Sequence, residues 1–205
     1  MLTYSFFYSN ILSMKTLILA SNNKGKLEEI RAILKDRFKV LSLSDCKISA
    51  DIEETGATFE ENALIKAKAV YRMTGLPVIS DDSGLEVYAL DGAPGVYSAR
   101  FAGDEHDDEK NNEKLLNLMK GKDNRDAAFV CCAVFYDGSR AVSAEGRAEG
   151  KILEKKDGDN GFGYDPLFYS YDLNKSFGCA SFEEEDSGSH RARALSARAE
   201  KLWII

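Results

Sequence analysis

The sequence predicts an α/β fold in which helices flank a mixed central β-sheet, with a smaller lobe built on residues 85–153. Short apolar runs of the kind found in buried strands alternate with segments of helical spacing, the pattern of strand–helix units. A long hairpin turning at Asp137-Gly138 adds antiparallel strands. Because the 205-residue chain has neither internal repeats nor a linker rich in Pro, Gly or Ser, residues 14–205 are expected to form one domain.

The first predicted unit is a strand at residues 16–20, a polar turn at 21–26 and a helix. The helix follows from Leu27, Ile30, Ile33 and Leu34, which recur on one face. Glu28 and Glu29 are expected in its first turn, where carboxylates suit the positive end of the helix dipole.

Three further helices are predicted. Thr58 and Glu61 have capping-box spacing, so a helix is expected from Thr58 to Gly75. Residues 85–90 alternate as a half-buried strand, and residues 107–119 form the next helix, with three inward-facing side chains: Leu115, Leu118 and Met119. Residues 167–169 predict a brief strand. The last helix starts near Ser189 and has five apolar residues at helical spacing: Ala192, Leu195, Ala199, Leu202 and Trp203.

The composition narrows the classes of function. A formal net charge of −7 argues against a nucleic-acid or anionic-membrane partner. The four cysteines show no CxxC spacing, so we interpret them as small apolar residues in a reducing cytoplasm. Residues 1–13 are expected to be a poorly ordered extension before a functional start at Met14, the alternative being a signal peptide whose apolar core ends at residues 17–20.

The turn at residues 21–26 predicts an anion site, because its amides lie at the N-terminus of a helix. Its side chains add donors and positive charge around a single glycine: Ser21, Asn22, Asn23, Lys24, Gly25 and Lys26. Neither the Walker A spacing nor the dinucleotide fingerprint is present. The structural alternative is an ordinary polar turn with an Asn cap.

Asp81 and Asp82 stand side by side at the mouth of the apolar segment 76–79. Adjacent carboxylates repel each other, and a divalent cation such as Mg²⁺ relieves that repulsion. Glu54 is placed to bring a third carboxylate toward the pair. A solvated acidic turn is the alternative.

Two further motifs carry candidate ligand contacts. Residues 161–166 combine glycines with Phe162, Tyr164 and Asp165, and aromatic faces stack on nucleobases. His190 and Arg191 offer donors to a keto oxygen, by the logic with which Arg reads guanine. A structural turn and a capped helix start are the respective alternatives. The other histidine, His106, is surrounded by acidic residues and is interpreted as solvated surface.

These motifs, in this order, resemble the inosine/xanthosine triphosphate pyrophosphatase family over roughly residues 15–203. The matching blocks are 21–26, 58–63, 80–85, 92–100, 161–166 and 189–191. The resemblance implies an ITPase-like fold and a homodimeric cytoplasmic enzyme. Such an enzyme uses Mg²⁺ to hydrolyse deaminated purine triphosphates (ITP, dITP, XTP) to the monophosphate and pyrophosphate, which cleanses the nucleotide pool.

The resemblance also implies roles for residues. Ser21, Asn23 and Lys26 would hold the triphosphate, with the rest of their turn. Asp81 and Glu54 would hold the metal, and Asp82 would act as the base on water while also touching the ion. The remaining substrate contacts would come from Ser83, Phe162, Gly163, Tyr164, Asp165, His190 and Arg191.

The chain departs from the family pattern at two places. Glu185 stands where the family usually has a lysine, and Lys175 is a candidate replacement for that cation at the substrate. Cys179 stands where the family tends to have an acid. A nucleotide-binding sensor or sequestering protein with weak or lost hydrolysis is therefore the alternative function. A Mg²⁺ phosphomonoesterase and a nucleic-acid binder are further alternatives.

Overall fold

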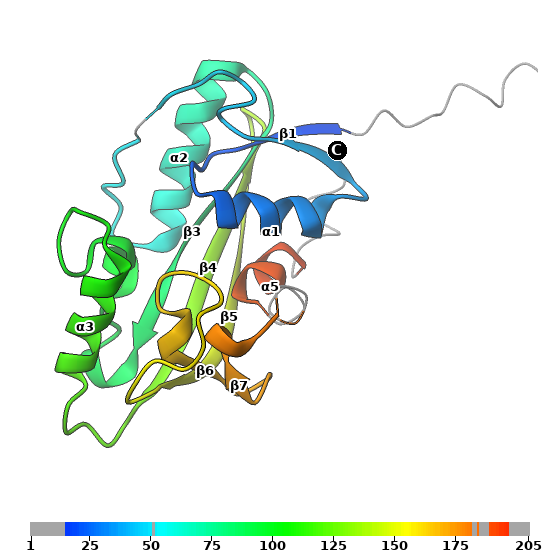
Figure 1. Ribbon diagram of the computed structural model, residues 1–205. Coiled ribbons are helices and arrows are strands. Elements are labelled where there is room, and N and C mark those ends of the chain that lie inside the picture. Colours follow the sequence, from blue (N-terminus) through cyan, green and yellow to red (C-terminus); the bar gives the residue numbers. More distant parts are fainter. Residues whose placement is uncertain (1–14, 51, 182–183, 185–188, 197–205) are drawn as a thin grey trace, which may run out of the picture.

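The computed structural model describes residues 15–50, 52–181, 184 and 189–196 (Figure 1). The predicted extension at residues 1–13 lies outside the described residues, as do Glu185, Ala199, Leu202 and Trp203. Within the described part of the chain, no helix combines the length and the apolar character that crossing a membrane requires.

One mixed sheet of seven strands organises the fold, in the order β2-β1-β3-β4-β5-β6-β7. β1 runs parallel to both β2 and β3, and every other neighbouring pair is antiparallel. The predicted mixed sheet is thus confirmed. Its strands are β1 (Lys15–Leu19), β2 (Phe38–Leu41), β3 (Val78–Val87), β4 (Asp126–Tyr136), β5 (Ala141–Ile152), β6 (Phe168–Ser170) and β7 (Lys175–Ser176).

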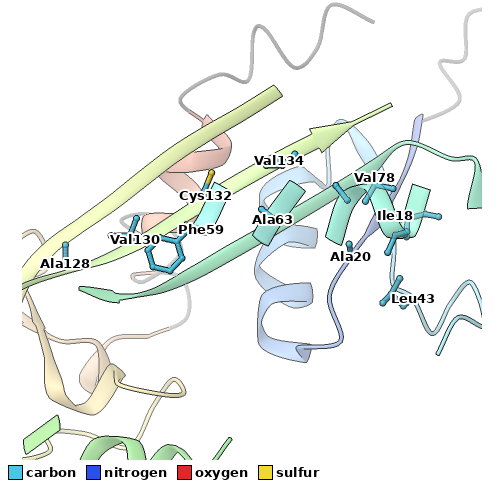
Figure 2. Close-up of a cluster of buried hydrophobic side chains, with 12 residues drawn as sticks. Ile18, Ala20, Leu43, Phe59, Ala63, Val78, Ala128, Val130, Cys132 and Val134 are labelled. Carbon is cyan, nitrogen blue, oxygen red and sulfur yellow. The ribbon is translucent and has the colours of Figure 1, made fainter. Parts of the chain in front are cut away.

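Helices cover both faces of the sheet, because the side chains of each strand alternate between faces. Leu17 and Leu19 of β1 pack with α1 (Lys24–Leu34) and α5 (His190–Ser196). Ile18 packs on the opposite face with α2 (Phe59–Thr74), in the cluster shown in Figure 2. α3 (Asp108–Leu118) covers the far half of β3 and β4 through Leu115.

The ends of α2 confirm the capping prediction. The Thr58 hydroxyl accepts a hydrogen bond from the Glu61 N–H at 3.2 Å, and the Glu61 carboxylate accepts one from the Ala57 N–H at 2.7 Å. At the other end Gly75 adopts a left-handed φ of 67° and donates to the Tyr71 carbonyl. Because Glu61 bonds to Ala57, the first turn of α2 also holds the end of the loop that precedes the helix.

The acidic pair lies within a strand, so the prediction that it sits at a strand mouth before a second strand at 85–90 is wrong. β3 pairs with β4 at every residue from Val78 to Val87. Residues 88–90 are a short 3-10 helix instead. A continuous strand can include both residues because each carboxylate has partners. Two cationic side chains contact Asp81, and a lysine and an asparagine contact Asp82, as described below.

Three local expectations also need correction. α1 begins at Lys24 after an Asn23 cap, so Glu28 and Glu29 lie beyond its first turn. Leu118 is 43% exposed, whereas Leu115 and Met119 are buried as expected. The hairpin after β4 was expected to turn within the two residues Asp137 and Gly138, but its loop spans residues 137–140, because the Asp137 carboxylate accepts from the amides of Ser139 and Arg140.

Candidate active site

A cavity of about 800 Å³ lies between the turn after β1, the loop before α2, β3 and residues 162–165. Fifteen of the predicted site residues line it: Ser21, Asn22, Asn23, Lys24, Gly25, Lys26, Glu54, Asp82, Ser83, Phe162, Gly163, Tyr164, Asp165, His190 and Arg191. The turn and the acidic strand therefore share one cavity. Asp81 and Lys175 do not line it.

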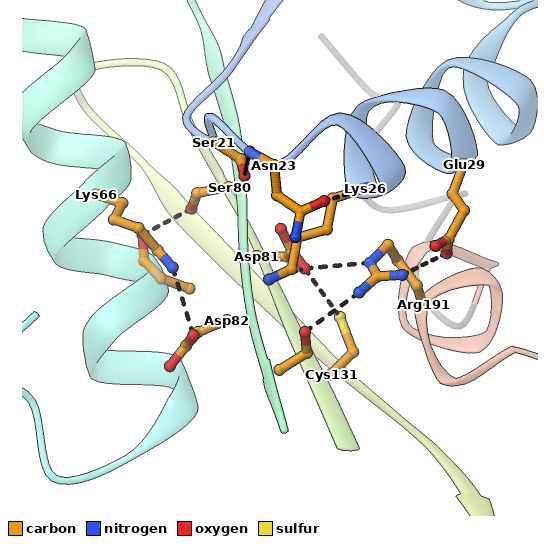
Figure 3. A network of polar contacts seen from close by, with 12 residues as sticks. Ser21, Asn23, Lys26, Glu29, Lys66, Ser80, Asp81, Asp82, Cys131 and Arg191 are labelled. Carbon is orange, nitrogen blue, oxygen red and sulfur yellow. Dashed lines mark hydrogen bonds and ion pairs between the residues drawn. The ribbon is translucent and has the colours of Figure 1, made fainter. Parts of the chain in front are cut away.

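Asp81 and Asp82 project from opposite faces of β3 (Figure 3). Asp81 points toward α1 and α5, where its Oδ2 lies 3.0 Å from Lys26 Nζ and 3.2 Å from Arg191 Nε. Asp82 points toward α2. The two neighbouring carboxylates thus enter two different environments, which the sequence did not suggest.

The Asp81 carboxylate is buried among cations. Burial by itself would raise its pKa, but the charges of Lys26, Arg191 and Lys66 hold the pKa well below the usual range. Asp81 is therefore ionised at neutral pH. Its other oxygen, Oδ1, is buried and has no hydrogen-bond partner among the described residues.

Arg191 is 2% exposed and joins three elements. Its guanidinium donates to Asp81 on β3, to Glu29 on α1 and, at 3.2 Å, to the Ser83 hydroxyl. One N–H on each of Nη1 and Nη2 lies outside these contacts, because each terminal nitrogen of a guanidinium carries two. Three of the five N–H groups that we expected to be available to a nucleobase thus bond to the protein itself.

The Asp82 carboxylate is held by two residues of α2. Asn62 Nδ2 donates to Oδ2 at 3.1 Å, and Lys66 Nζ lies 3.4 Å from Oδ1. Lys66 Nζ also lies 3.1 Å from Glu54 Oε2. Burial raises the pKa of Asp82, against the opposing effect of the Lys66 and Lys26 charges. Burial alone would lower the pKa of Lys66, but the charges of Asp82, Asp81 and Glu54 raise it.

The predicted cluster of Glu54, Asp81 and Asp82 is not assembled. Within the described ranges, no three His, Cys, Asp or Glu side chains lie close enough to hold a metal ion together. The reason is the alternation of β3, which turns Asp81 away from the other two carboxylates. Glu54 and Asp82 remain on one wall of the cavity, on either side of the Lys66 ammonium.

The turn after β1 is ordered by its own side chains. The Asn23 carboxamide oxygen accepts from the Lys26 N–H at 3.1 Å, and the Ser21 hydroxyl accepts from the Asn23 N–H at 3.1 Å. Asn22 Nδ2 donates to the Ala50 carbonyl at 3.3 Å. Asn23 is thus the helix cap that we considered as the structural alternative, and the cap also shapes the predicted anion site.

Residues 162–165 form the opposite wall. Asp165 Oδ2 accepts from the Phe162 N–H at 2.7 Å, so this carboxylate shapes its own loop. Gly163 is bonded to α3 through both backbone groups, to Asp108 and Asn112. A Cβ at Gly25 would lie 3.0 Å from the Phe162 ring, which shows how closely the two walls approach.

The two histidines differ in surroundings. His190 is 7% exposed and stacks on Phe129, with ring centroids 5.1 Å apart. Burial, followed by the charges of Arg191 and Lys26, lowers its pKa well below 6.5 and keeps the ring neutral at pH 7. Its Nδ1 is buried and has no partner among the described residues. His106 is exposed, as expected, but it also lines the cavity.

Lys175 does not take the place that we predicted for it. Its ammonium lies 2.8 Å from Glu184 Oε1, away from the cavity lining. Glu184 is close in sequence, and this exposed pair satisfies the cation locally. We therefore no longer assign Lys175 to the substrate.

Sequence reasoning missed several buried polar residues of the site, among them Glu29, Asn62 and Lys66. A signal for two of them was present. Asn62 and Lys66 are four residues apart and share one face of α2, where they interrupt a buried stripe of Ala63, Ala67 and Val70. Polar residues within a buried stripe require partners, and here the partner is Asp82.

Comparisons with known proteins show the family to which this chain belongs. The model of the Ham1 family matches residues 17–201. A dITP/XTP pyrophosphatase of Clostridium perfringens is 46% identical over 199 residues, covering 92% of this chain and 98% of that protein. One from Desulforamulus reducens is 47% identical, covering 91% and 94%.

Solved structures show the same fold. The Staphylococcus aureus Ham1 protein superposes with a TM-score of 0.83 at 42% identity, covering 92% of this chain and 98% of that one. A HAM1 protein from Coxiella burnetii gives a TM-score of 0.84 at 37% identity, with the same coverage. The fold predicted from the motifs is therefore confirmed.

Proposed function

Because the chain belongs to the Ham1 family, we propose that it hydrolyses deaminated purine nucleoside triphosphates, among them dITP, ITP and XTP, to the monophosphate and pyrophosphate. The observation that carries the proposal is that the cationic turn and Asp82 of the acidic strand line one cavity, beside the ion pair between Lys26 and Asp81. Relatives bearing the name dITP/XTP pyrophosphatase supply the substrate class.

The turn at residues 21–26 binds the triphosphate in this proposal. The backbone amides at the N-terminus of α1 lie beside the cavity, and the helix dipole favours an anion there. Lys24 and Lys26 add positive charge, and Asp81 keeps the Lys26 ammonium in place. Charge spreads over phosphate oxygens during phosphoryl transfer, so fixed donors and cations at this turn stabilise the transition state.

Glu54 and Asp82 are our candidates for holding Mg²⁺. Proteins commonly bind this ion through one or two carboxylates together with substrate phosphates, and these two face the cavity from one wall. Asp81, which we expected as a ligand, is enclosed by Lys26 and Arg191 and is left out of the set. When bound, the ion neutralises charge on the phosphates and the leaving group.

Asp82 is our candidate for the base that orients the attacking water and takes its proton. It lines the cavity, and its burial raises the pKa, which makes the carboxylate a better proton acceptor. Asn62 and Lys66 hold its two oxygens in a defined orientation. Attack in line with the departing pyrophosphate then breaks the bond at the α-phosphorus.

Base recognition is assigned to residues 162–165, His190 and Arg191. Phe162 provides an aromatic face on the cavity wall. The neutral His190 ring and the remaining N–H groups of Arg191 suit a 6-keto oxygen. Adenine carries an amino group there, which would leave a buried donor unpaired at a cost of about 1–3 kcal/mol.

The resemblance further implies a homodimer that works on the cytoplasmic nucleotide pool, and we include both in the proposal. Light scattering of the purified chain measures the first. Twice the monomer mass is expected, and the mass of one chain would remove the dimer from the proposal.

A panel of nucleoside triphosphates, assayed with and without Mg²⁺ while resolving pyrophosphate from orthophosphate, tests the function. Pyrophosphate from dITP, ITP and XTP, little from ATP, and none without Mg²⁺ are expected. Nucleotide binding without any product would favour the sensor or sequestering protein. Orthophosphate as the first product would favour a phosphomonoesterase.

A further inference from the structure

Asn62 connects two parts of the site that are distant in sequence. Its side chain is fully buried at 0% exposed. Nδ2 donates to Asp82 Oδ2 at 3.1 Å, and Oδ1 accepts from the Gly56 N–H at 2.7 Å. Because an N–H must face an acceptor and a carboxylate must face a donor, the two partners determine the orientation of the carboxamide.

The loop before α2 is held at that contact. Gly56 is two residues after Glu54, and the next amide, of Ala57, donates to Glu61 at 2.7 Å. A Cβ at Gly56 would lie 2.7 Å from Asn62 Oδ1 and 2.7 Å from Glu61 Cβ. The loop backbone therefore packs directly on Asn62, with no room for a side chain between them.

We propose that Asn62 is a positioning residue that sets the separation between the Glu54 and Asp82 carboxylates. The inference rests on the proposed function, in which these two carboxylates hold Mg²⁺. Lys66 also contacts both, but its charge competes with a cation for the same oxygens. Asn62 is neutral, so it holds the loop and Asp82 in one arrangement with or without the ion.

The expected size of the effect follows from residues that orient metal ligands in other proteins. Their loss typically lowers metal affinity or activity by about 10–100-fold. Asn62→Ala removes both hydrogen bonds. Asn62→Gln retains both polar groups but displaces them by one methylene, so it tests position rather than polarity.

The direct test measures Mn²⁺ binding to the free protein by electron paramagnetic resonance, without nucleotide. The dissociation constant is expected to rise by about 10–100-fold in Asn62→Ala and to rise also in Asn62→Gln. With dITP, kcat falls while KM changes little. An unchanged Mn²⁺ affinity in both variants overturns the inference, whatever the activity of the wild type.

Ser80→Ala is the matched control for a loss of stability alone. The Ser80 hydroxyl is buried and donates to the Ala63 carbonyl at 2.6 Å, in the same interface between α2 and β3, without touching either carboxylate. This variant is expected to unfold at a lower temperature while its Mn²⁺ affinity stays at the wild-type value. A rise in its dissociation constant equal to that of Asn62→Ala would reduce Asn62 to a packing role.

A double-mutant cycle with Glu54→Gln separates the two roles further. If Asn62 acts through Glu54, the combined loss of Mn²⁺ affinity is smaller than the sum of the single losses. Strict additivity contradicts the inference. The proposed function fails separately, when the wild type releases no pyrophosphate from any triphosphate in the panel.

Discussion

The ammonium of Lys26 lies 3.0 Å from the buried Asp81 carboxylate, which joins the first turn of α1 to the middle of β3. This contact joins the turn that we propose as the anion site to the strand whose next residue, Asp82, lines the same cavity as that turn (Figure 3). The two aspartates therefore have different partners and different roles. Asp81 anchors cations on one face of β3, and Asp82 faces the cavity and α2 on the other.

Replacement of the candidate base should affect turnover far more than affinity. In Asp82→Asn, kcat for dITP is expected to fall by about 10²–10⁴-fold, because general-base catalysis typically contributes that much. The variant keeps an oxygen for the Asn62 donor, while its amide nitrogen replaces the oxygen that faces Lys66. Asp36→Asn, on the exposed surface after α1, is the control. Wild-type kcat in Asp82→Asn would remove the base role.

Loss of the Lys66 charge should make the protein more dependent on Mg²⁺ for its stability. Lys66→Met leaves Glu54 and Asp82 without their shared cation, and the free energy of unfolding is expected to fall by about 1–3 kcal/mol. A bound Mg²⁺ replaces the missing charge and stabilises the folded state by mass action. Urea unfolding with and without Mg²⁺ measures both effects.

Lys68→Met, in the same helix, is the control for the lost lysine stem. Its free energy of unfolding should gain no more from Mg²⁺ than that of the wild type. If Mg²⁺ stabilises Lys66→Met, Lys68→Met and the wild type equally, Glu54 and Asp82 do not form a cation site.

His190 should make stability depend on pH below about 6.5. Burial and nearby cations lower its folded-state pKa well below 6.5, so the unfolded chain binds the proton first as pH falls. The free energy of unfolding is therefore unaffected by this group above the unfolded-state pKa. It decreases as pH falls from there toward the folded-state pKa.

His190→Phe removes this titration and keeps a ring for Phe129 to stack on. Urea unfolding of both proteins from pH 8 to 4.5 should show a wild-type curve that falls more steeply below pH 6.5. Parallel curves would show that the imidazole is equally free to protonate in both states.

Loss of the Phe162 ring should weaken nucleotide binding without loss of stability. The ring is 42% exposed and lines the cavity, and base stacking on an aromatic side chain contributes about 1–3 kcal/mol. KM for dITP in Phe162→Ala is expected to rise by about five- to 150-fold, with kcat little changed. Tyr171→Ala, an exposed aromatic outside the cavity, is the control. Equal KM values in the two variants would exclude stacking at Phe162.

Several elements could be predicted because their signals are local. The capping box at Thr58 and Glu61 and the left-handed Gly75 mark both ends of α2. The strand and turn before α1 follow from an apolar run and an Asn cap. The resemblance of the motif blocks likewise predicted the family that the comparisons report.

Other features could not be read along the chain. Lys175 was expected at the substrate because a cation was missing nearby in sequence, yet a local acidic neighbour, Glu184, binds it instead. The sequence suggested a contact of Arg191 with the base, but not that Glu29 and Asp81, which lie 162 and 110 residues away in sequence, would accept two of its N–H groups.

The sequence by itself determined the α/β class, the ends of α2, the family and fifteen of the residues that line the cavity. These depend on periodicity, caps and motif order, which act over a few residues. Only the tertiary structure decided that the side chains of Asp81 and Asp82 project from opposite faces of one strand. That outcome depends on the pairing of β3 with β4 along its whole length and on Lys26, Arg191, Asn62 and Lys66 meeting it from three different helices.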